Sequence, residues 1–204
     1  MRAISKRYGG VTALDQVDFA CAAGSIHAVL GENGAGKSTL IKTIAGVVQP
    51  DAGRILMDGV EVHLASPNVA RNHGIACVFQ ELSLVPDLSV AENIFLSRPP
   101  RRRGLIDSKA QQEQALALLA MLGCSDIHPR ERVRDLPLSR RQLIEIAKAL
   151  SGQPRLLILD EATSALSSED VERLYKLLFQ LRARGVGSLF ISHRMHEVKV
   201  LADT

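Results

Sequence analysis

Residues 31–38 have the composition and spacing of a segment that wraps around phosphate groups. They match the pattern G-x-x-x-x-G-K-S/T and lie between an apolar run at 26–30 and a helical pattern at 37–45. Glycines let successive backbone N–H groups turn toward one anion, and the start of the following helix adds its dipole. The lysine can neutralise the outer phosphates, and the serine hydroxyl can ligate magnesium. We therefore predict a phosphate-binding loop made of Gly31, Glu32, Asn33, Gly34, Ala35, Gly36, Lys37 and Ser38.

Two other interpretations of this segment are weaker. The spacing of Gly31, Gly34 and Gly36 differs from that of a dinucleotide-binding fingerprint. A glycine turn without any ligand is the plain structural alternative. From average residue usage, however, a chance match in such a chain is on the order of one in a hundred.

Two adjacent carboxylates follow an apolar segment in the last third of the chain. Residues 156–159 are predicted as a buried strand, so Asp160 lies at the carboxyl edge of a sheet, where open α/β sheets bind ligands. Asp160 is expected to hold magnesium, directly or through water. Glu161 is expected to orient and deprotonate an attacking water, a contribution of about 10²- to 10⁴-fold. Carboxylates at strand ends also serve as helix caps, and the phosphate loop upstream is what favours the catalytic interpretation.

The elements that must position these residues alternate between strands and helices. Apolar patterns predict strands at 17–21, 26–30, 75–79, 156–159 and 188–191. A hairpin is expected across Asp58-Gly59, and helices at 37–45, after Ser66-Pro67 and before Gly185. This alternation predicts an α/β fold with a mainly parallel sheet covered by helices.

Between residues 86 and 151 the pattern is helical. A capping box at Ser89 and Glu92 precedes a long amphipathic run at 108–122. We expect one domain over residues 1–204, with residues 1–85 and 152–204 as its core and about 86–151 as an inserted helical subdomain. The arginine-rich stretch 98–104 is expected to be a solvated loop.

Composition excludes several classes of protein. A net charge of +3 and 3% aromatic residues argue against a nucleic-acid surface. Cys21, Cys77 and Cys124 are odd in number and widely spaced, which suits neither a disulfide framework nor a zinc site and favours a reducing, cytosolic compartment. The longest apolar run, 115–122, is too short for a membrane helix, and the N-terminus lacks a signal peptide's apolar core. We therefore expect a chain that neither spans a membrane nor is secreted.

Taken in order, these motifs resemble those of the ATPase subunits of ABC transporters, over essentially all 204 residues. The resemblance implies a P-loop ATPase fold with an antiparallel β portion, and ATP and Mg²⁺ as cofactors. It implies that Tyr8 stacks on adenine, that Gln80 reaches the magnesium and the membrane partner, and that His193 meets the γ-phosphate. Alone, these three could equally be a surface ring, a strand-end polar group and a helix cap. The implied nucleotide site also includes Thr39, and the implied magnesium site comprises Ser38, Gln80 and Asp160.

The resemblance is greater to the sugar-import branch, the ribose, galactose and xylose type, whose ATPase chains usually carry two such domains. Residues 80–94, 145–150 and 191–195 resemble its first domain. This implies an ATP-hydrolysing importer subunit, peripheral on the cytoplasmic face of the cell membrane. The implied partners are a second nucleotide-binding domain packed head-to-tail, membrane permease subunits and, indirectly, a substrate-binding protein, with no nucleic acid. The chain ends before the strands that ordinarily follow the switch histidine, and its first strand looks shortened, so truncation is expected.

The chain departs from the family at two motifs. The LSGGQ signature aligns with residues 136–140, where Pro137 replaces its serine and Ser139 its second glycine. A match shifted to 138–142 keeps more residues but needs the next helix to start late. Ser167 replaces an aspartate that follows the two carboxylates, and it can cap the next helix. Two alternatives therefore stay open, a degenerate half that binds nucleotide without turnover and a soluble ABC-type ATPase.

Overall fold

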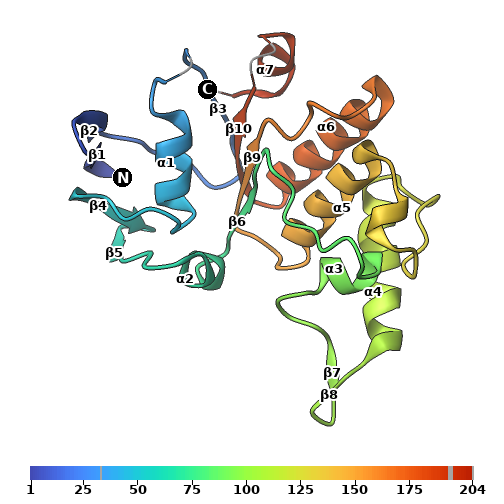
Figure 1. The fold of residues 1–204 in the computed structure, drawn as a ribbon. Helices are drawn as coiled ribbons and strands as arrows, with labels where there is room; N and C mark the ends of the chain where they lie inside the picture. The colour runs from blue at the N-terminus through green and yellow to red at the C-terminus, as the bar shows by residue number, and fades with distance from the viewer. Residues whose placement is uncertain (33, 193–194, 204) are drawn as a thin grey trace.

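A parallel sheet forms the centre of the fold. The computed structural model describes residues 1–32, 34–192 and 195–203. Its parallel strands lie in the order β3 (Ile26–Val29), β10 (Gly187–Ile191), β9 (Leu156–Asp160) and β6 (Ile75–Val78) (Figure 1). The four strands confirm the predictions at 26–30, 75–79, 156–159 and 188–191. The chain leaves β3 and β9 at the same edge of this sheet.

A second sheet is antiparallel and contains the start of the chain. Its order is β2 (Val11–Val17), β1 (Arg2–Tyr8), β4 (Ala52–Met57) and β5 (Val60–Val62), and the turn between β4 and β5 is the predicted hairpin. The strand predicted at 17–21 is wrong, because β2 ends at Val17. Just beyond that end, the side chain of Asp18 accepts a hydrogen bond from the N–H of Ala3 at 2.7 Å. A carboxylate thus takes the partner that a backbone carbonyl would need to continue the ladder.

In the described part of the chain, four helices accompany these sheets, and two of them begin at caps that the sequence predicted. They are α1 (Lys37–Ile44), α2 (Pro67–Asn72), α6 (Ser168–Ala183) and α7 (Met195–Leu201). Ser66 caps α2 by accepting from the N–H of Val69, and Ser167 caps α6 by accepting from the N–H of Asp170. Such caps satisfy backbone donors that the first turn of a helix leaves open.

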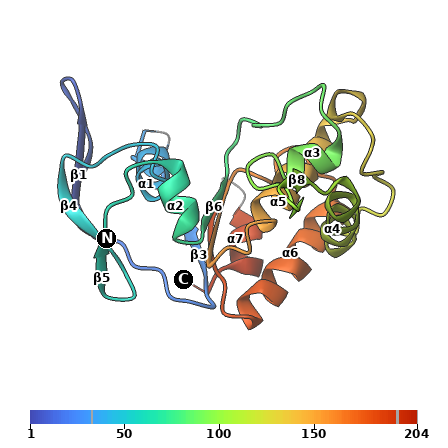
Figure 2. The ribbon, with the colours of Figure 1, turned by 90° about the horizontal axis from the view of Figure 1, so that it is seen from below.

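Alternate residues of the parallel strands face two different apolar layers. Ile158 and Leu189 pack with α1 and the antiparallel sheet, while Leu157, Leu159 and Phe190 face the other layer. Figure 2 shows α1 and α2 between the antiparallel sheet and the parallel sheet, with α6 and the helices between residues 86 and 151 on the other side of the parallel sheet. Because both faces of the parallel sheet are covered, its strands are mostly apolar.

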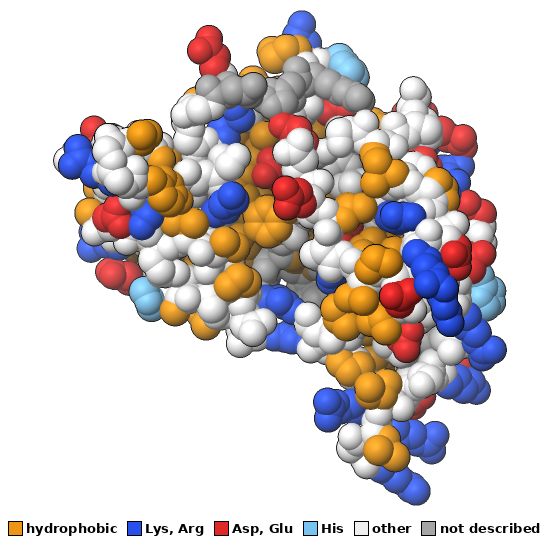
Figure 3. Space-filling view, in the orientation of Figure 1, with side chains coloured by type: hydrophobic (Ala, Val, Ile, Leu, Met, Phe, Trp, Pro, Cys, Tyr) orange, Lys and Arg blue, Asp and Glu red, His pale blue; other side chains and the backbone are white. Residues whose placement is uncertain are grey.

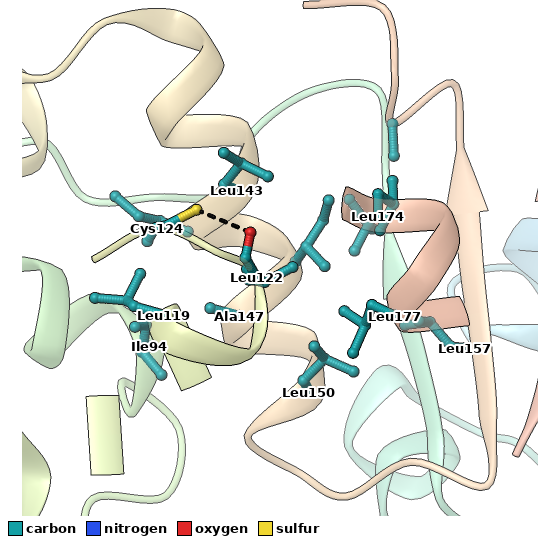
Figure 4. Packing of buried hydrophobic residues seen from close by; sticks show 14 of the residues in the cluster. Ile94, Leu119, Leu122, Cys124, Leu143, Ala147, Leu150, Leu157, Leu174 and Leu177 are labelled. Atoms are coloured by element: carbon teal, nitrogen blue, oxygen red, sulfur yellow. Dashed lines mark hydrogen bonds between the residues drawn. The ribbon is translucent and has the colours of Figure 1, made fainter. Parts of the chain in front are cut away.

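The helical block contains α3 (Val90–Ile94), α4 (Ser108–Met121), the short 3₁₀ turn Val133–Asp135 and α5 (Leu138–Leu150). The predicted capping box at Ser89 and Glu92 starts α3. Helix α5 lies in the middle of a continuous apolar cluster (Figure 4). In that view the α5 residues Leu143, Ala147 and Leu150 lie between two groups of apolar side chains. One group comes from the helical block and comprises Ile94, Leu119 and Leu122. The other comes from β9 and α6 and comprises Leu157, Leu174 and Leu177.

The arginine-rich stretch is not a loop, contrary to the sequence expectation. It forms a hairpin of β7 (Arg101–Arg102) and β8 (Leu105–Ile106), inserted between α3 and α4. Its two turn residues, Arg103 and Gly104, have φ of 53° and 85°. Positive φ at both central residues is the geometry of a type I′ turn, which matches the twist of a tight hairpin. The regular structure therefore depends on a non-glycine residue in a conformation that composition did not indicate.

Candidate functional site

The phosphate loop joins the end of β3 to the start of α1. Gly36 is the N-cap of α1 with φ 86°, and the N–H of Leu40 donates to its carbonyl at 2.9 Å. Gly34 also has a positive φ, 85°, and among the described residues no atom lies within 4 Å of a Cβ built there. Asn33 is outside the described residues. An exposed loop that ends at a helix with a glycine N-cap leaves the first N–H groups of α1 available to an anion.

Lys37 folds back across this loop. Its Nζ donates to the carbonyl of Gly31 at 2.6 Å and to that of Glu32 at 2.8 Å. The positive charge is therefore held against the loop backbone. Ser38 and Thr39 follow in the first turn of α1, where Ser38 is exposed and Thr39 is half-buried.

Asp160, the last residue of β9, and Glu161, which follows it, lie at the same edge of the parallel sheet as the phosphate loop. Ile191 of β10 is in register with both Val29 of β3 and Asp160 of β9, so the three strands end level. Burial and the nearby charge of Asp160 raise the pKa of the Cys77 thiol, which indicates that the carboxylate lies beside β6. This register agrees with the prediction that the phosphate loop and Asp160 lie at one edge of the sheet.

Glu161 has a strained backbone. Its φ is 51°, its N–H donates to the carbonyl of Ile191 at 3.1 Å, and its carbonyl accepts from the N–H of Ser164 at 3.2 Å. A non-glycine residue in the left-handed region costs of order 1–3 kcal/mol and persists only where its surroundings over-determine it. Such strain is typical of functional sites, and it fixes the direction in which Glu161 leaves the strand.

Gln80 lies two residues beyond β6, at the same edge. Val78 is in register with Leu159, so the exposed Gln80 follows a strand that ends beside Asp160. The positions of Gln80 and Asp160 are thus compatible with one shared site.

Sequence analysis missed a polar link that follows Gln80. Ser83 donates from its N–H and its hydroxyl to the carboxylate of Glu145, and Lys148 Nζ donates to the Ser83 carbonyl at 3.0 Å and hydroxyl at 2.7 Å. Glu145 is only 5% exposed. The link ties the segment after β6 to α5. A Glu and a Lys three residues apart in the otherwise apolar stretch 143–150 were the only signal in the sequence.

Glu197 was also missed, and it joins two loops of the site. It is fully buried, and its Oε2 accepts from the hydroxyl of Thr163 at 3.1 Å and from that of Ser192 at 2.6 Å. Thr163 follows Glu161 by two residues, and Ser192 follows β10. His193 itself lies outside the described residues. A single acidic residue at the start of a short helix carried no signal in the sequence.

Tyr8 lies at the end of β1, in the hairpin that packs beside the phosphate loop. Tyr8 is 46% exposed, and Lys6 Nζ lies 5.7 Å from the centroid of its ring. The following strand approaches Gly36 so closely that a Cβ there would lie 2.4 Å from the carbonyl oxygen of Ala13. The hairpin is therefore near the loop, and stacking of Tyr8 on a base stays a prediction.

Pro137 is the N-cap of α5, and the helix begins directly after it at Leu138. The shifted alignment of the signature needs a late helix start, so this boundary favours the alignment of Pro137 with the signature serine. Pro137 is exposed and Ser139 is half-buried. A proline at this position offers neither an N–H nor a hydroxyl to a ligand.

A groove of about 360 Å³ separates α2 and β6 from the ends of α3 and α5. Figure 3 shows the surface hollowed between the two halves of this face. The lining is largely apolar, and the Ser83–Glu145–Lys148 link forms part of it, together with Phe79, Leu96 and Ala149.

The residues predicted to hold magnesium offer hard oxygen ligands of the kind that this ion prefers. Ser38 is in the first turn of α1 and Asp160 ends β9, on the shared sheet edge. Within residues 1–32, 34–192 and 195–203, no group of three or more His, Cys, Asp or Glu side chains is arranged to hold a metal ion.

Comparison with known proteins agrees with this architecture. Residues 14–164 match the family described as ABC transporter. Ribose import ATP-binding protein RbsA 1 of Rhizobium johnstonii is 62% identical over 203 residues, 100% of this chain and 40% of that protein. RbsA 1 of Streptomyces avermitilis is 52% identical over 98% of this chain and 38% of its own length. The chain thus spans about two fifths of the length of these curated relatives.

A solved structure of similar fold is a nucleotide-free ATP-binding cassette from an ABC transporter. It is 25% identical and superposes with a TM-score of 0.84 over 99% of this chain and 83% of its own. None of the helices that the structure describes is both long and apolar enough to cross a membrane. With a family match over most of its length, relatives above 50% identity and the cassette fold, the chain belongs to the ABC transporter family.

Proposed function

We propose that this chain binds Mg-ATP and hydrolyses it as the ATP-binding part of a membrane importer, with a sugar as the cargo. The observation that carries the proposal is the shared sheet edge, to which β3 brings the phosphate loop and β9 brings Asp160 and Glu161. The printed names of the relatives, ribose import ATP-binding proteins, support the import of a sugar.

In the proposed reaction, water attacks the γ-phosphate of ATP and ADP leaves. The N–H groups at the start of α1 and the ammonium of Lys37 stabilise the charge that develops on the phosphate oxygens. Ser38 and Asp160 would hold the magnesium ion, which neutralises phosphate charge when bound. Glu161 orients the attacking water and accepts its proton. Because its backbone is fixed by the hydrogen bond to Ile191, its carboxylate has few alternative directions.

Two further residues are proposed to report the γ-phosphate to other parts of the assembly. Gln80 lies between the carboxylate edge and the Ser83–Glu145–Lys148 link, which borders the groove. A shift in the position of Gln80 can therefore be transmitted to α5 and the groove through Ser83, which is only three residues further along the chain. We assign His193 the corresponding role on the other loop, beside Ser192.

The groove is proposed as the docking site of a permease subunit, at the cytoplasmic face of the membrane. It is largely apolar and is lined by Phe79 and Ser83, so an inserted segment would contact residues on either side of Gln80 in the sequence. A second nucleotide-binding domain, packed head-to-tail, would complete the phosphate loop of this chain with its own signature.

The alternative of a nucleotide-binding half without turnover is favoured by one observation, the exposed Pro137 at the N-cap of α5. In a head-to-tail dimer this residue would face the partner's nucleotide. Loss of donors there would impair the partner's site and leave the site built on Lys37 intact, so we favour hydrolysis at that site.

The test combines nucleotide titration with hydrolysis by the complete transporter. Lys37→Ala should weaken ATP binding by about ten- to a hundredfold, because a hydrogen bond from a charged donor contributes roughly 1.5–3 kcal/mol. Glu161→Gln should keep ATP binding and abolish steady-state hydrolysis, since the amide retains the shape and loses the basic oxygen. Glu172→Gln, an exposed residue of α6, is the matched control and should keep both. Undiminished turnover in Glu161→Gln would assign the proton acceptor elsewhere.

A further inference from the structure

The hairpin β7–β8 has no role in the proposed site, yet its side chains form an unusual surface. All six residues from Arg101 to Ile106 are exposed. Leu105 is 76% and Ile106 56% exposed, although both are aliphatic. Figure 1 shows the hairpin projecting from the helical block, away from the phosphate loop.

The cations of this hairpin, Arg101, Arg102 and Arg103, form no ion pair with any described residue. The sequence from 93 to 106 contains no acidic residue, and Arg98 adds a fourth arginine. Figure 3 shows the result as a protruding tip of basic and hydrophobic side chains.

Strand pairing distributes the two kinds of side chain evenly. Arg101 is opposite Ile106, and Arg102 is opposite Leu105. Directly opposed residues in an antiparallel pair project from the same face, so each face of the hairpin carries one guanidinium and one aliphatic chain. The type I′ turn and a 2.8 Å hydrogen bond from the N–H of Asp107 to the carbonyl of Pro100 hold this arrangement.

We propose that this hairpin is a membrane contact, in which the arginines bind anionic phospholipid headgroups and Leu105 and Ile106 enter the boundary between headgroups and acyl chains. Charge complementarity selects an anionic surface, and the aliphatic chains select one that is apolar immediately below its charge. An acidic protein loop would match the arginines but would leave an aliphatic chain uncovered on at least one face.

The position of the hairpin fits such a contact. The chain leads from Leu96 and Arg98, which line the groove, directly into β7. If the groove holds a permease segment, the hairpin lies on the side of the protein that faces the permease, next to the bilayer. The inference rests on the proposed function only for this location at a membrane, and the contact itself requires no hydrolysis.

The test is flotation of the purified chain with vesicles. One set contains phosphatidylglycerol and phosphatidylcholine in equal amounts, and the other contains phosphatidylcholine alone. We expect flotation with the anionic set, little with the neutral set, and loss of binding as salt rises. Arg101→Gln/Arg102→Gln/Arg103→Gln should reduce partitioning by about a hundredfold, at roughly fivefold per arginine.

Two further variants separate the hairpin from general effects. Leu105→Ser/Ile106→Ser keeps every charge and should also weaken flotation. Arg54→Gln/Lys176→Gln/Arg184→Gln lowers the net charge by the same amount at exposed positions outside the hairpin and should float like the unchanged chain.

Each remaining outcome overturns the inference. Equal flotation of the hairpin triple variant, or an equal loss in the control triple variant, would show that the hairpin is not the contact. No flotation of the unchanged chain, with the hairpin instead crosslinking to a permease, would assign it to a protein partner. An ATP titration of every variant separates these results from failure of the proposed function, because the hairpin variants should bind ATP normally.

Discussion

Replacement of Gly36 by alanine should destabilise the protein far more than the same replacement at Gly34. Both glycines belong to the phosphate loop and both have a left-handed backbone, with φ of 86° and 85°. Their surroundings differ. A Cβ at Gly36 would lie 2.4 Å from the carbonyl oxygen of Ala13 and 3.1 Å from the Leu14 side chain, whereas none of the described atoms lies within 4 Å of a Cβ at Gly34.

The magnitude follows from two contributions. Alanine in the left-handed region costs about 1–2 kcal/mol at either position. At Gly36 the neighbouring β2 backbone must also move, and forcing atoms into packed space typically costs a further 1–3 kcal/mol. Reduced entropy of the unfolded chain favours both variants equally and cancels in the comparison. Gly36→Ala should therefore lose about 1–3 kcal/mol more of its free energy of unfolding than Gly34→Ala.

Thermal unfolding without nucleotide measures this difference free of any change in ATP binding. For a chain of this length, 1 kcal/mol corresponds to roughly 2–4 °C, so the Tm of Gly36→Ala should lie about 2–12 °C below that of Gly34→Ala. Gly59→Ala provides a second reference, since its φ is 81° and the described structure leaves its Cβ position open. Equal Tm values for the three variants would refute the close approach of β2 to the phosphate loop.

The remaining predictions concern the signature and a buried carboxylate. In the assembled transporter, Pro137→Ser/Ser139→Gly should raise hydrolysis at the partner's site, by about ten- to a hundredfold for a regained charge-assisted contact, and not at the Lys37 site. Disabling each phosphate-loop lysine in turn measures this, and a gain at the Lys37 site would contradict the trans assignment. Burial raises the pKa of Asp170, but its hydrogen bond from Ser167 and the charge of Arg140 outweigh this and lower it overall. Asp170→Asn should therefore destabilise the protein at neutral pH, and in urea unfolding its difference from the unchanged chain should shrink as pH falls below about 4. If the difference in free energy of unfolding persists at lower pH, the ion pair between Asp170 and Arg140 is not its source.

Much of the candidate site could be predicted because its signals are local. The glycine spacing of residues 31–38 and the carboxylates after 156–159 identify a loop and a strand end without knowledge of any distant residue. The caps at Ser66, Ser89 and Ser167 were predictable for the same reason, since each hydrogen bond spans three residues.

The predictions that failed had two different causes, one a contact with a distant residue and the other a local backbone conformation. The strand at 17–21 was lost to a hydrogen bond between Asp18 and Ala3, and the expected loop at 98–104 became a hairpin through the left-handed conformation of Arg103. In both stretches the local composition was compatible with more than one backbone conformation.

The sequence by itself determined the chemistry available to this protein, which is a phosphate loop and two carboxylates at the end of one strand. It could do so because spacing along a short segment dictates which groups can face one ligand. Only the tertiary structure decided what surrounds that chemistry. Thr163 meets Glu197 across 34 residues, Ser83 meets Glu145 across 62, and Gly36 lies against β2. Such contacts leave no periodic pattern in the chain, because they arise only when separate elements pack together and bury polar groups that must then find partners.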